Sequence, residues 1–198
     1  AWEPAFKEQG LELKPGLVKR FFGMSQSRIE ELVAQAYGND PRAISAVCEH
    51  VRIGIEEMLA NGAPKKPGLD ELLALLSDKG VPCAVASASP RTLVEAHLRK
   101  GGVEAYFSAV IAGDDGLPSK PAPDVFLEAA CRLHAAPANS LVLEDSPNGI
   151  RAASAGGFLS VMVPDMIAPT PETRRFATRV CSSLLDVCDL IAKGELGR

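Results

Sequence analysis

Several features that mark large classes of protein are missing from this chain. It has no apolar run of the roughly 18 residues that a membrane-spanning helix requires, and no signal peptide is visible. Its formal net charge of −4 provides no basic face, which argues against a nucleic-acid partner. The five cysteines include no Cys-x-x-Cys pair, and the three histidines include no His-x-x-x-His pair. We therefore expect a cytoplasmic protein that binds neither membrane nor nucleic acid.

The pattern of apolar residues divides the chain into two parts. Residues 1–62 show helical spacing only, and Asn61 and Gly62 are typical of a helix end. Two prolines then bracket a hinge at 63–68, after which predicted helices and strands alternate. The sequence therefore predicts a small all-helical domain at 1–62 and a second domain at 63–198.

The alternation after the hinge is typical of βαβ units, so the predicted fold class is α/β with a Rossmann-like parallel sheet. A content of 46% apolar residues over 198 residues supports a sizeable core. Strands are expected near 81–86, 108–112, 140–144 and 158–163, and helices near 69–79, 90–100, 122–134, 147–156 and 183–193.

Two adjacent acids, Glu144 and Asp145, stand at the end of the predicted strand 140–144. Neighbouring carboxylates repel, and in an apolar setting they need a cation or hydrogen-bond donors to compensate. Magnesium suits such a pair, because it is usually held by one or two carboxylates and by substrate phosphate. The alternative is that Asp145 or Ser146 simply caps the next helix.

Two further loops follow predicted strands in the same way. Ser87, Ala88 and Ser89 lie between a strand and a helix, where small residues and a helix N-terminus favour an anion. Lys120 precedes two prolines that stiffen the approach to another helix. Helix capping by Ser89 and an ordinary solvated Lys120 are the alternatives.

The shared context favours a common site over these alternatives. Ligands of open parallel sheets bind outside the carboxyl ends of the strands, and Ser87, Lys120 and the acid pair each follow a different predicted strand. Together they would offer a hydroxyl, backbone donors, a fixed positive charge and a metal-binding acid pair. That combination suits a phosphoryl group, whose transfer depends mainly on positioning and charge stabilisation.

With these motifs, the chain resembles the haloacid dehalogenase-like hydrolases, in the branch that contains beta-phosphoglucomutase and small sugar-phosphate phosphatases. The resemblance covers essentially the whole chain. It implies that Ser87 and Ala88 bind the transferring phosphoryl group, that Lys120 steadies its charge, and that Asp145 and Glu144 hold Mg²⁺.

The resemblance also implies a role for the helical domain as a cap over the site. Residues 22–25 are similar to the cap segment that faces the substrate, so Gly23 and Gln26, together with Ser89 of the core, are expected to contact it. Gln26 stands where the mutase has an arginine for a second phosphate. A neutral amide should bind that phosphate poorly, which favours hydrolysis over a mutase reaction.

One motif of the family is absent from the sequence. The family's nucleophile and its general acid–base belong to an Asp-x-Asp motif after the first strand, and no Asp-x-Asp occurs here. Because Ala1 to Phe6 resembles the helix that follows this motif, we expect the natural protein to carry that strand upstream of Ala1.

Three functions remain open at this stage. The first is a Mg²⁺-dependent phosphatase that hydrolyses a small phosphorylated metabolite, of the sugar-phosphate type, through a phosphoaspartate. The second is a phosphosugar mutase, and the third is a phosphometabolite-binding protein without catalysis. The 198-residue chain alone is expected to be inactive, and a monomer or weak dimer is expected.

Overall fold

The computed structural model describes the chain except for residues 1, 22–23, 25, 39, 59–63 and 197–198. Its N-terminal part consists of four helices: α1 (Trp2–Glu8), α2 (Leu17–Phe21), α3 (Gln26–Tyr37) and α4 (Pro41–Met58). No strand occurs among the described residues of this part. The boundary predicted at residue 62 lies outside the described residues.

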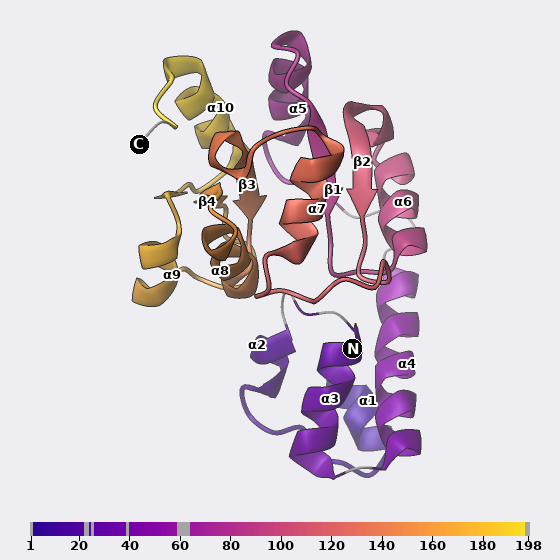
Figure 1. Cartoon of the computed structure of the whole chain (residues 1–198). Coiled ribbons are helices and arrows are strands. Elements are labelled where there is room, and N and C mark those ends of the chain that lie inside the picture. The colour runs from indigo at the N-terminus through magenta and orange to yellow at the C-terminus, as the bar shows by residue number, and fades with distance from the viewer. Residues whose placement is uncertain (1, 22–23, 25, 39, 59–63, 197–198) are drawn as a thin grey trace.

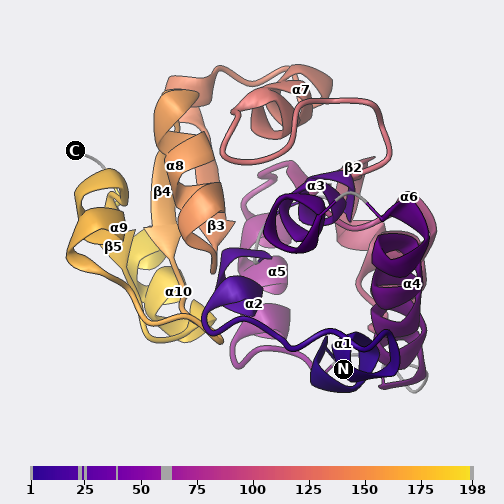
Figure 2. The ribbon, with the colours of Figure 1, turned by 90° about the horizontal axis from the view of Figure 1, so that it is seen from below.

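The four N-terminal helices have a hydrophobic core of their own. Phe6, Val33 and Val47 are completely buried at its centre, and the rings of Trp2 and Tyr37 pack against Phe6 in tilted orientations. In Figure 1 these helices lie below the rest of the molecule, and Figure 2 shows them from below, in front of the α/β part. They therefore form a separately packed layer.

The remainder of the described chain alternates strands and helices, which confirms the predicted α/β class. Two groups of parallel strands are hydrogen-bonded: β1 (Cys83–Ala86) with β2 (Phe107–Ile111), and β3 (Leu141–Glu144) with β4 (Leu159–Met162) and β5 (Arg179–Val180). The helices are α5 (Leu69–Asp78), α6 (Arg91–Lys100), α7 (Asp124–Arg132), α8 (Pro147–Ala155), α9 (Pro171–Phe176) and α10 (Leu184–Lys193), with short 3₁₀ turns η1 (Glu104–Tyr106) and η2 (Pro137–Asn139).

Alternating side chains of β3 build two cores on opposite faces of the sheet, because successive residues of a strand point to opposite sides. Leu141 and Leu143 pack with α5 and α10, whereas Val142 packs with α7 and α8. Glu144 shares its parity with Val142, so the same rule directs it toward α7 and α8. Both faces are therefore covered by helices, as expected for a parallel sheet.

The carboxyl ends of the strands face the N-terminal helices. In Figure 1 the arrows of β2 and β3 point down toward α1 to α4. The loops that leave β1 and β3, which carry Ser87 and the Glu144–Asp145 pair, therefore lie on the side of the α/β part that faces the N-terminal helices.

None of the described helices combines the length and the apolar composition that crossing a membrane would require.

Candidate active site

A small cavity brings two of the predicted site segments together. Ser87 and Ala88, from the loop after β1, line it with Lys120, from the loop before α7. Its volume is about 20 Å³, and a cavity needs on the order of 10–15 Å³ to hold a water molecule. The cavity has room for little more than one water, although its lining includes the Ser87 hydroxyl and the Lys120 amine.

Lys120 is held from three sides. Its side chain is only 6% exposed, and its Nζ donates to Oε1 of Glu144 at 2.5 Å and to the carbonyl of Ala86 at 3.2 Å. The ring of Phe126 lies below the ammonium, 4.6 Å from Nζ to the ring centroid. A buried ammonium must be paired, and these contacts pair it. Because Ala86 directly precedes Ser87, they also hold the ammonium next to the loop that carries Ser87.

Glu144 forms the other half of this buried pair. Its Oε2 accepts hydrogen bonds from the backbone N–H of Asp145 (2.9 Å), the backbone N–H of Ser146 (2.8 Å) and the Ser146 hydroxyl (2.9 Å). Burial alone would raise the pKa of Glu144, but the Lys120 charge and the hydrogen bonds from Lys120 and Ser146 outweigh it and lower that pKa. Glu144 is therefore an ionised partner of Lys120.

Asp145 is an exposed residue with a different environment. Its pKa is raised, first because nearby protein atoms partly desolvate the carboxylate and then because Glu144 is negative; the Lys66 ammonium acts in the opposite direction. A carboxylate in this position gains from a bound cation. No cluster of three or more His, Cys, Asp or Glu side chains suited to a metal is found among the described residues.

The helix that follows the acids, α8, is capped by Ser146, one of the two predicted capping residues. The Ser146 hydroxyl accepts from the backbone N–H of Gly149 at 3.0 Å, and Pro147 occupies the first helical position. Asp145 is thus not used as the cap, and it is not among the residues that line the cavity at Ser87 and Lys120.

The loop after β1 is held by a neighbouring loop. Ser89 does not cap α6: its N–H donates to the Ser87 hydroxyl oxygen, and its carbonyl accepts from Gly113. A Cβ on Gly113 would lie 2.0 Å from the Ala88 carbonyl oxygen, so only glycine allows this approach. The first N–H of α6, on Arg91, is bonded by Asp114 at 2.9 Å.

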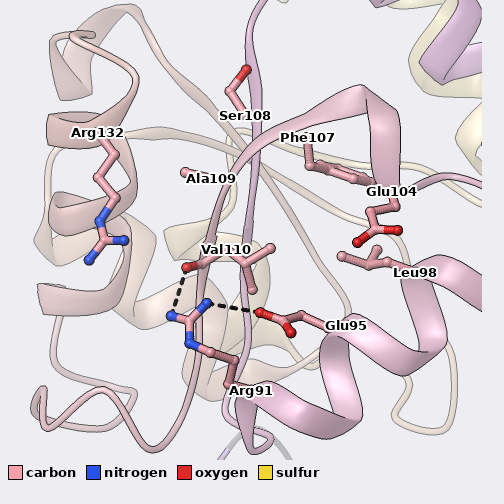
Figure 3. A pocket seen from close by; sticks show the side chains of 9 residues that line it. All are labelled: Arg91, Glu95, Leu98, Glu104, Phe107, Ser108, Ala109, Val110 and Arg132. Atoms are coloured by element: carbon pink, nitrogen blue, oxygen red, sulfur yellow. Dashed lines mark hydrogen bonds and ion pairs between the residues drawn. The ribbon is translucent and has the colours of Figure 1, made fainter.

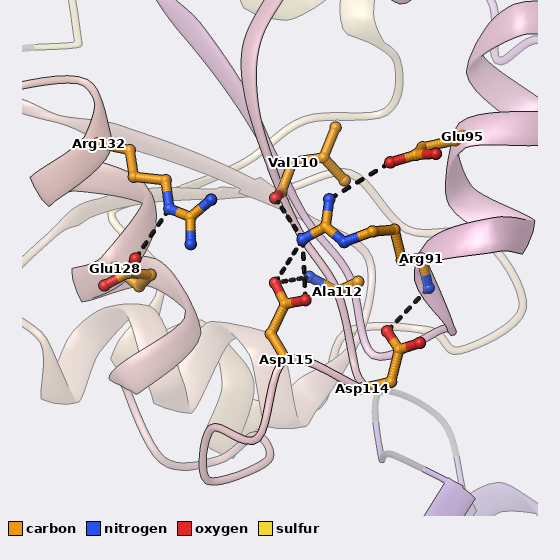
Figure 4. A network of polar contacts seen from close by, with 8 residues as sticks. All are labelled: Arg91, Glu95, Val110, Ala112, Asp114, Asp115, Glu128 and Arg132. Carbon is orange, nitrogen blue, oxygen red and sulfur yellow. Dashed lines mark hydrogen bonds and ion pairs between the residues drawn. The ribbon is translucent and has the colours of Figure 1, made fainter.

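Arg91 joins these two loops through a charged network (Figure 4). Its guanidinium donates to both carboxylate oxygens of Asp115, at 2.8 and 2.7 Å, and to the carbonyl of Val110 at 3.1 Å. The hydrogen bond from Arg91 lowers the pKa of Asp115 and in turn raises the pKa of Arg91. The Asp-Asp-Gly turn is therefore fixed to the start of α6.

A larger hollow of about 530 Å³ lies beside β2 (Figure 3). It runs along the side of the strand that is not paired with β1, between α6 and the side chain of Arg132 from α7. Its lining carries charges of both signs, Arg91 and Arg132 with Glu95 and Glu104. None of the predicted site residues lines it.

Two substrate contacts predicted in the helical part remain predictions. Gly23 lies outside the described residues. Gln26 is the first residue of α3, where its side-chain amide donates to Glu30 at 3.1 Å.

Sequence reasoning missed two residues near the site. Lys66 contacts Asp165, 3.6 Å from its Nζ, and influences Asp145. Gly149 lies in α8, directly against Glu144. Gly149 could have been found from the sequence, because a glycine within a helical pattern is unusual. Nothing in the sequence marks Lys66.

Comparison with known proteins agrees with this arrangement. The model of the haloacid dehalogenase-like hydrolases matches residues 5–157. The chain is 30% identical over 173 residues to hexitol phosphatase B of Escherichia coli K12, covering 86% of this chain and 77% of that protein. It is 39% identical over 122 residues to a bifunctional riboflavin kinase/FMN phosphatase of Arabidopsis thaliana, covering 61% of this chain but only 32% of that longer protein.

Solved structures with this fold include a beta-phosphoglucomutase from Clostridium difficile. It superposes with a TM-score of 0.79 at 21% identity, covering 98% of this chain and 87% of that one. The family match spans both the helical part and the site loops. The chain belongs to the haloacid dehalogenase-like hydrolase family.

Proposed function

We propose that the natural protein is a Mg²⁺-dependent phosphatase that hydrolyses a small phosphorylated metabolite of the sugar-phosphate type. The observation that carries this proposal is the Lys120–Glu144 pair, buried beside Ser87 and adjacent to Asp145. Together these residues present a fixed cation, a hydroxyl and a second carboxylate on loops next to the strands. Names of relatives such as hexitol phosphatase B support the substrate class.

Each site residue has a proposed role. The Ser87 hydroxyl and the backbone of Ala88 bind phosphoryl oxygens, and the Lys120 ammonium neutralises the charge that they carry. Glu144 keeps Lys120 in place. Because Lys120 is held before substrate arrives, little reorganisation is needed when the reaction begins.

The Asp145 carboxylate fits a magnesium ion. Its charge is poorly compensated within the protein, and magnesium takes one or two carboxylates together with substrate phosphate and water. When bound, the ion would supply further charge neutralisation at the phosphoryl group. Glu144, whose two oxygens already accept hydrogen bonds, is proposed as a secondary or water-bridged ligand.

The nucleophile is proposed to be an aspartate upstream of Ala1, on a strand between β1 and β3. Hydrogen bonding among the described residues leaves these two strands in separate groups. The four side chains of β1 are all half-buried, although they are small and apolar. An additional strand would bury them and place its carboxyl end beside Lys120.

Residues 1–62 are proposed to act as a cap over this site, and Gly23, Gln26 and Ser89 are proposed to contact the substrate. The separate core of the first four helices supports this division, as does their location opposite the strand ends. Gln26 has no cationic charge for a second phosphate, which favours a phosphatase over a mutase.

The test is phosphate release by the protein with its natural upstream sequence. A panel of sugar phosphates and other small monoesters is assayed with and without Mg²⁺. Activity should require Mg²⁺ and should fall by at least about a hundredfold in Lys120→Met, since electrostatic groups of this kind contribute roughly that factor or more. Lys79→Met, at an exposed lysine, is the matched control. Tight binding of these esters without turnover would instead indicate a binding protein.

A further inference from the structure

The carboxylate of Glu144 lies against the first turn of α8. The turn supplies it with donors, from Asp145 and Ser146, while Lys120 approaches its other oxygen. This arrangement requires the Glu144 side chain to fold back from the end of β3 over the helix. The helix must therefore leave space for it.

Gly149 is the residue that leaves this space. A Cβ built on Gly149 would lie 1.9 Å from the Glu144 carboxyl carbon, 2.0 Å from Oε1 and 2.5 Å from Oε2. These separations are shorter than any real non-bonded contact to a Cβ, so the carboxylate and a side chain at 149 cannot coexist in this geometry.

The backbone gives no other reason for glycine at this position. Gly149 lies within α8 and does not adopt a positive φ. In a helix, alanine is favoured over glycine by roughly 0.8–1.0 kcal/mol. Helix stability alone would therefore favour alanine at position 149. Glycine is needed instead because the Glu144 carboxylate occupies the space of the alanine methyl group.

We propose that Gly149 is a positioning residue, which acts through Glu144 to fix the Lys120 ammonium at the phosphoryl site. The catalytic meaning of this proposal rests on the proposed function. The atoms that a Cβ at 149 would meet are those at the end of the Glu144 side chain, so a methyl group there displaces the carboxylate rather than the helix. Displacement breaks the hydrogen bonds to the turn and removes the counter-charge of Lys120.

The first experiment measures the chemical reactivity of the Lys120 amine, without turnover. The protein is treated with a limiting acetylating reagent, and modification of each lysine is followed by peptide mass spectrometry. In the wild type, Lys120 should react far more slowly than the exposed Lys79. Gly149→Ala should increase the rate of Lys120 acetylation, relative to that of Lys79, by about tenfold or more. Glu144→Gln should increase this relative rate as well.

General destabilisation must be separated from this local effect. Val187→Ala, which removes buried side-chain atoms from the core between α10 and the sheet, provides a destabilised control in which the Lys120 site is intact. Gly149→Ala and Val187→Ala are compared in conditions where the native state of each is fully populated. An unchanged Lys120 rate in Gly149→Ala, or an equal increase in Val187→Ala, would overturn the proposal.

The second experiment is a double-mutant cycle on the unfolding equilibrium. Gly149→Ala should raise the unfolding constant by roughly ten- to a hundredfold, the usual range for overpacking. In the Glu144→Ala background the same change should be neutral or stabilising. Ser154→Gly and Ser154→Ala measure the glycine–alanine preference elsewhere in α8. Equal effects of Gly149→Ala in the two backgrounds would contradict the proposal.

The two proposals can fail separately. If the cycle and the labelling behave as expected but the protein hydrolyses no phosphate ester, Gly149 positions Lys120 and the proposed function is wrong. If phosphatase activity is found and Gly149→Ala leaves both it and the Lys120 reactivity unchanged, the positioning role is wrong.

Discussion

Arg91 holds Asp115 through a single guanidinium nitrogen that lies 2.8 and 2.7 Å from the two carboxylate oxygens, and so joins the start of α6 to the loop after β2. The side chain of Asp115 is 18% exposed and that of Arg91 is 35% exposed, so the Asp115 carboxylate is the more buried partner. It stabilises the loop that carries Ser87 against the loop that leads to Lys120.

The first prediction concerns the pH dependence of this contact. In the folded protein the pKa of Asp115 is lowered, by the Arg91 hydrogen bond first and also by the N–H of Ala112 and the charge of Arg132. A lowered carboxyl pKa adds stability above the unfolded value of about 3.9, and this stability is lost as the pH falls through the folded pKa. Asp115→Asn should therefore destabilise the protein at pH 7 and have less effect near pH 3. Urea unfolding of both proteins at each pH measures the difference, and a pH-independent loss would contradict the prediction.

The second prediction concerns the buried ion pair. Lys120→Met should destabilise the protein by about 3–5 kcal/mol, because it leaves the Glu144 charge buried without its counter-charge. Adding Glu144→Leu removes that charge, so the double variant should lose less stability than Lys120→Met alone. Urea unfolding of the single and double variants tests this, and strictly additive losses would show that the two residues are not coupled.

The third prediction separates the two acids. Asp145→Asn should weaken Mg²⁺ binding more than Glu144→Gln. Desolvation first, and then the negative Glu144, raise the pKa of Asp145, so its carboxylate gains from a cation, whereas Glu144 is already bound by Lys120 and Ser146. Removing the direct ligand should lower the Mg²⁺ affinity by at least roughly 10–100-fold, the loss typical when a residue that only supports a metal ligand is mutated. Calorimetric titration with Mg²⁺ on the protein with its upstream sequence measures both. A larger effect of Glu144→Gln would reverse the assignment.

The fourth prediction concerns the 198-residue chain by itself. We expect no release of phosphate from a generic aryl phosphate, because Ser87, Lys120 and Asp145 can position a phosphoryl group but the proposed nucleophile lies upstream. The protein extended by its natural upstream residues, assayed in parallel, is the positive control. Turnover by the shorter chain that disappears in Lys120→Ala would show that a nucleophile lies within it.

Local sequence patterns predicted most of the fold. Leu141 to Leu143 is an apolar run before two acids, and the expected strand at 140–144 is found as β3. By contrast, α9 and β5 were not predicted. Residues 179–180 make a strand of two residues, which is too short for a periodicity.

The candidate site was predictable only to the level of loops. The rule that parallel strands end at one edge predicted that Ser87, Lys120 and Asp145 lie together; Ser87 and Lys120 line one cavity, and Asp145 is not among its lining residues. It could not reveal that Glu144 turns toward Lys120, 24 residues earlier in the chain, since this depends on the packing of α7 and α8. The use of Asp114 to cap the start of α6 was hidden for the same reason.

Among the residues that the structure describes, no strand pairs with β2 on the side away from β1, and this has a consequence for the protein in concentrated solution. An unpaired strand edge is a template for another chain, and its danger falls when the edge is irregular or charged. Here the pairing of β2 with β1 is shifted by an extra residue near Ser108, and Arg91 occupies the carbonyl of Val110. A neighbouring molecule must displace that guanidinium before it can extend the sheet, so the outer edge of this fold is protected against aggregation by the same arginine that orders the loop beside Ser87.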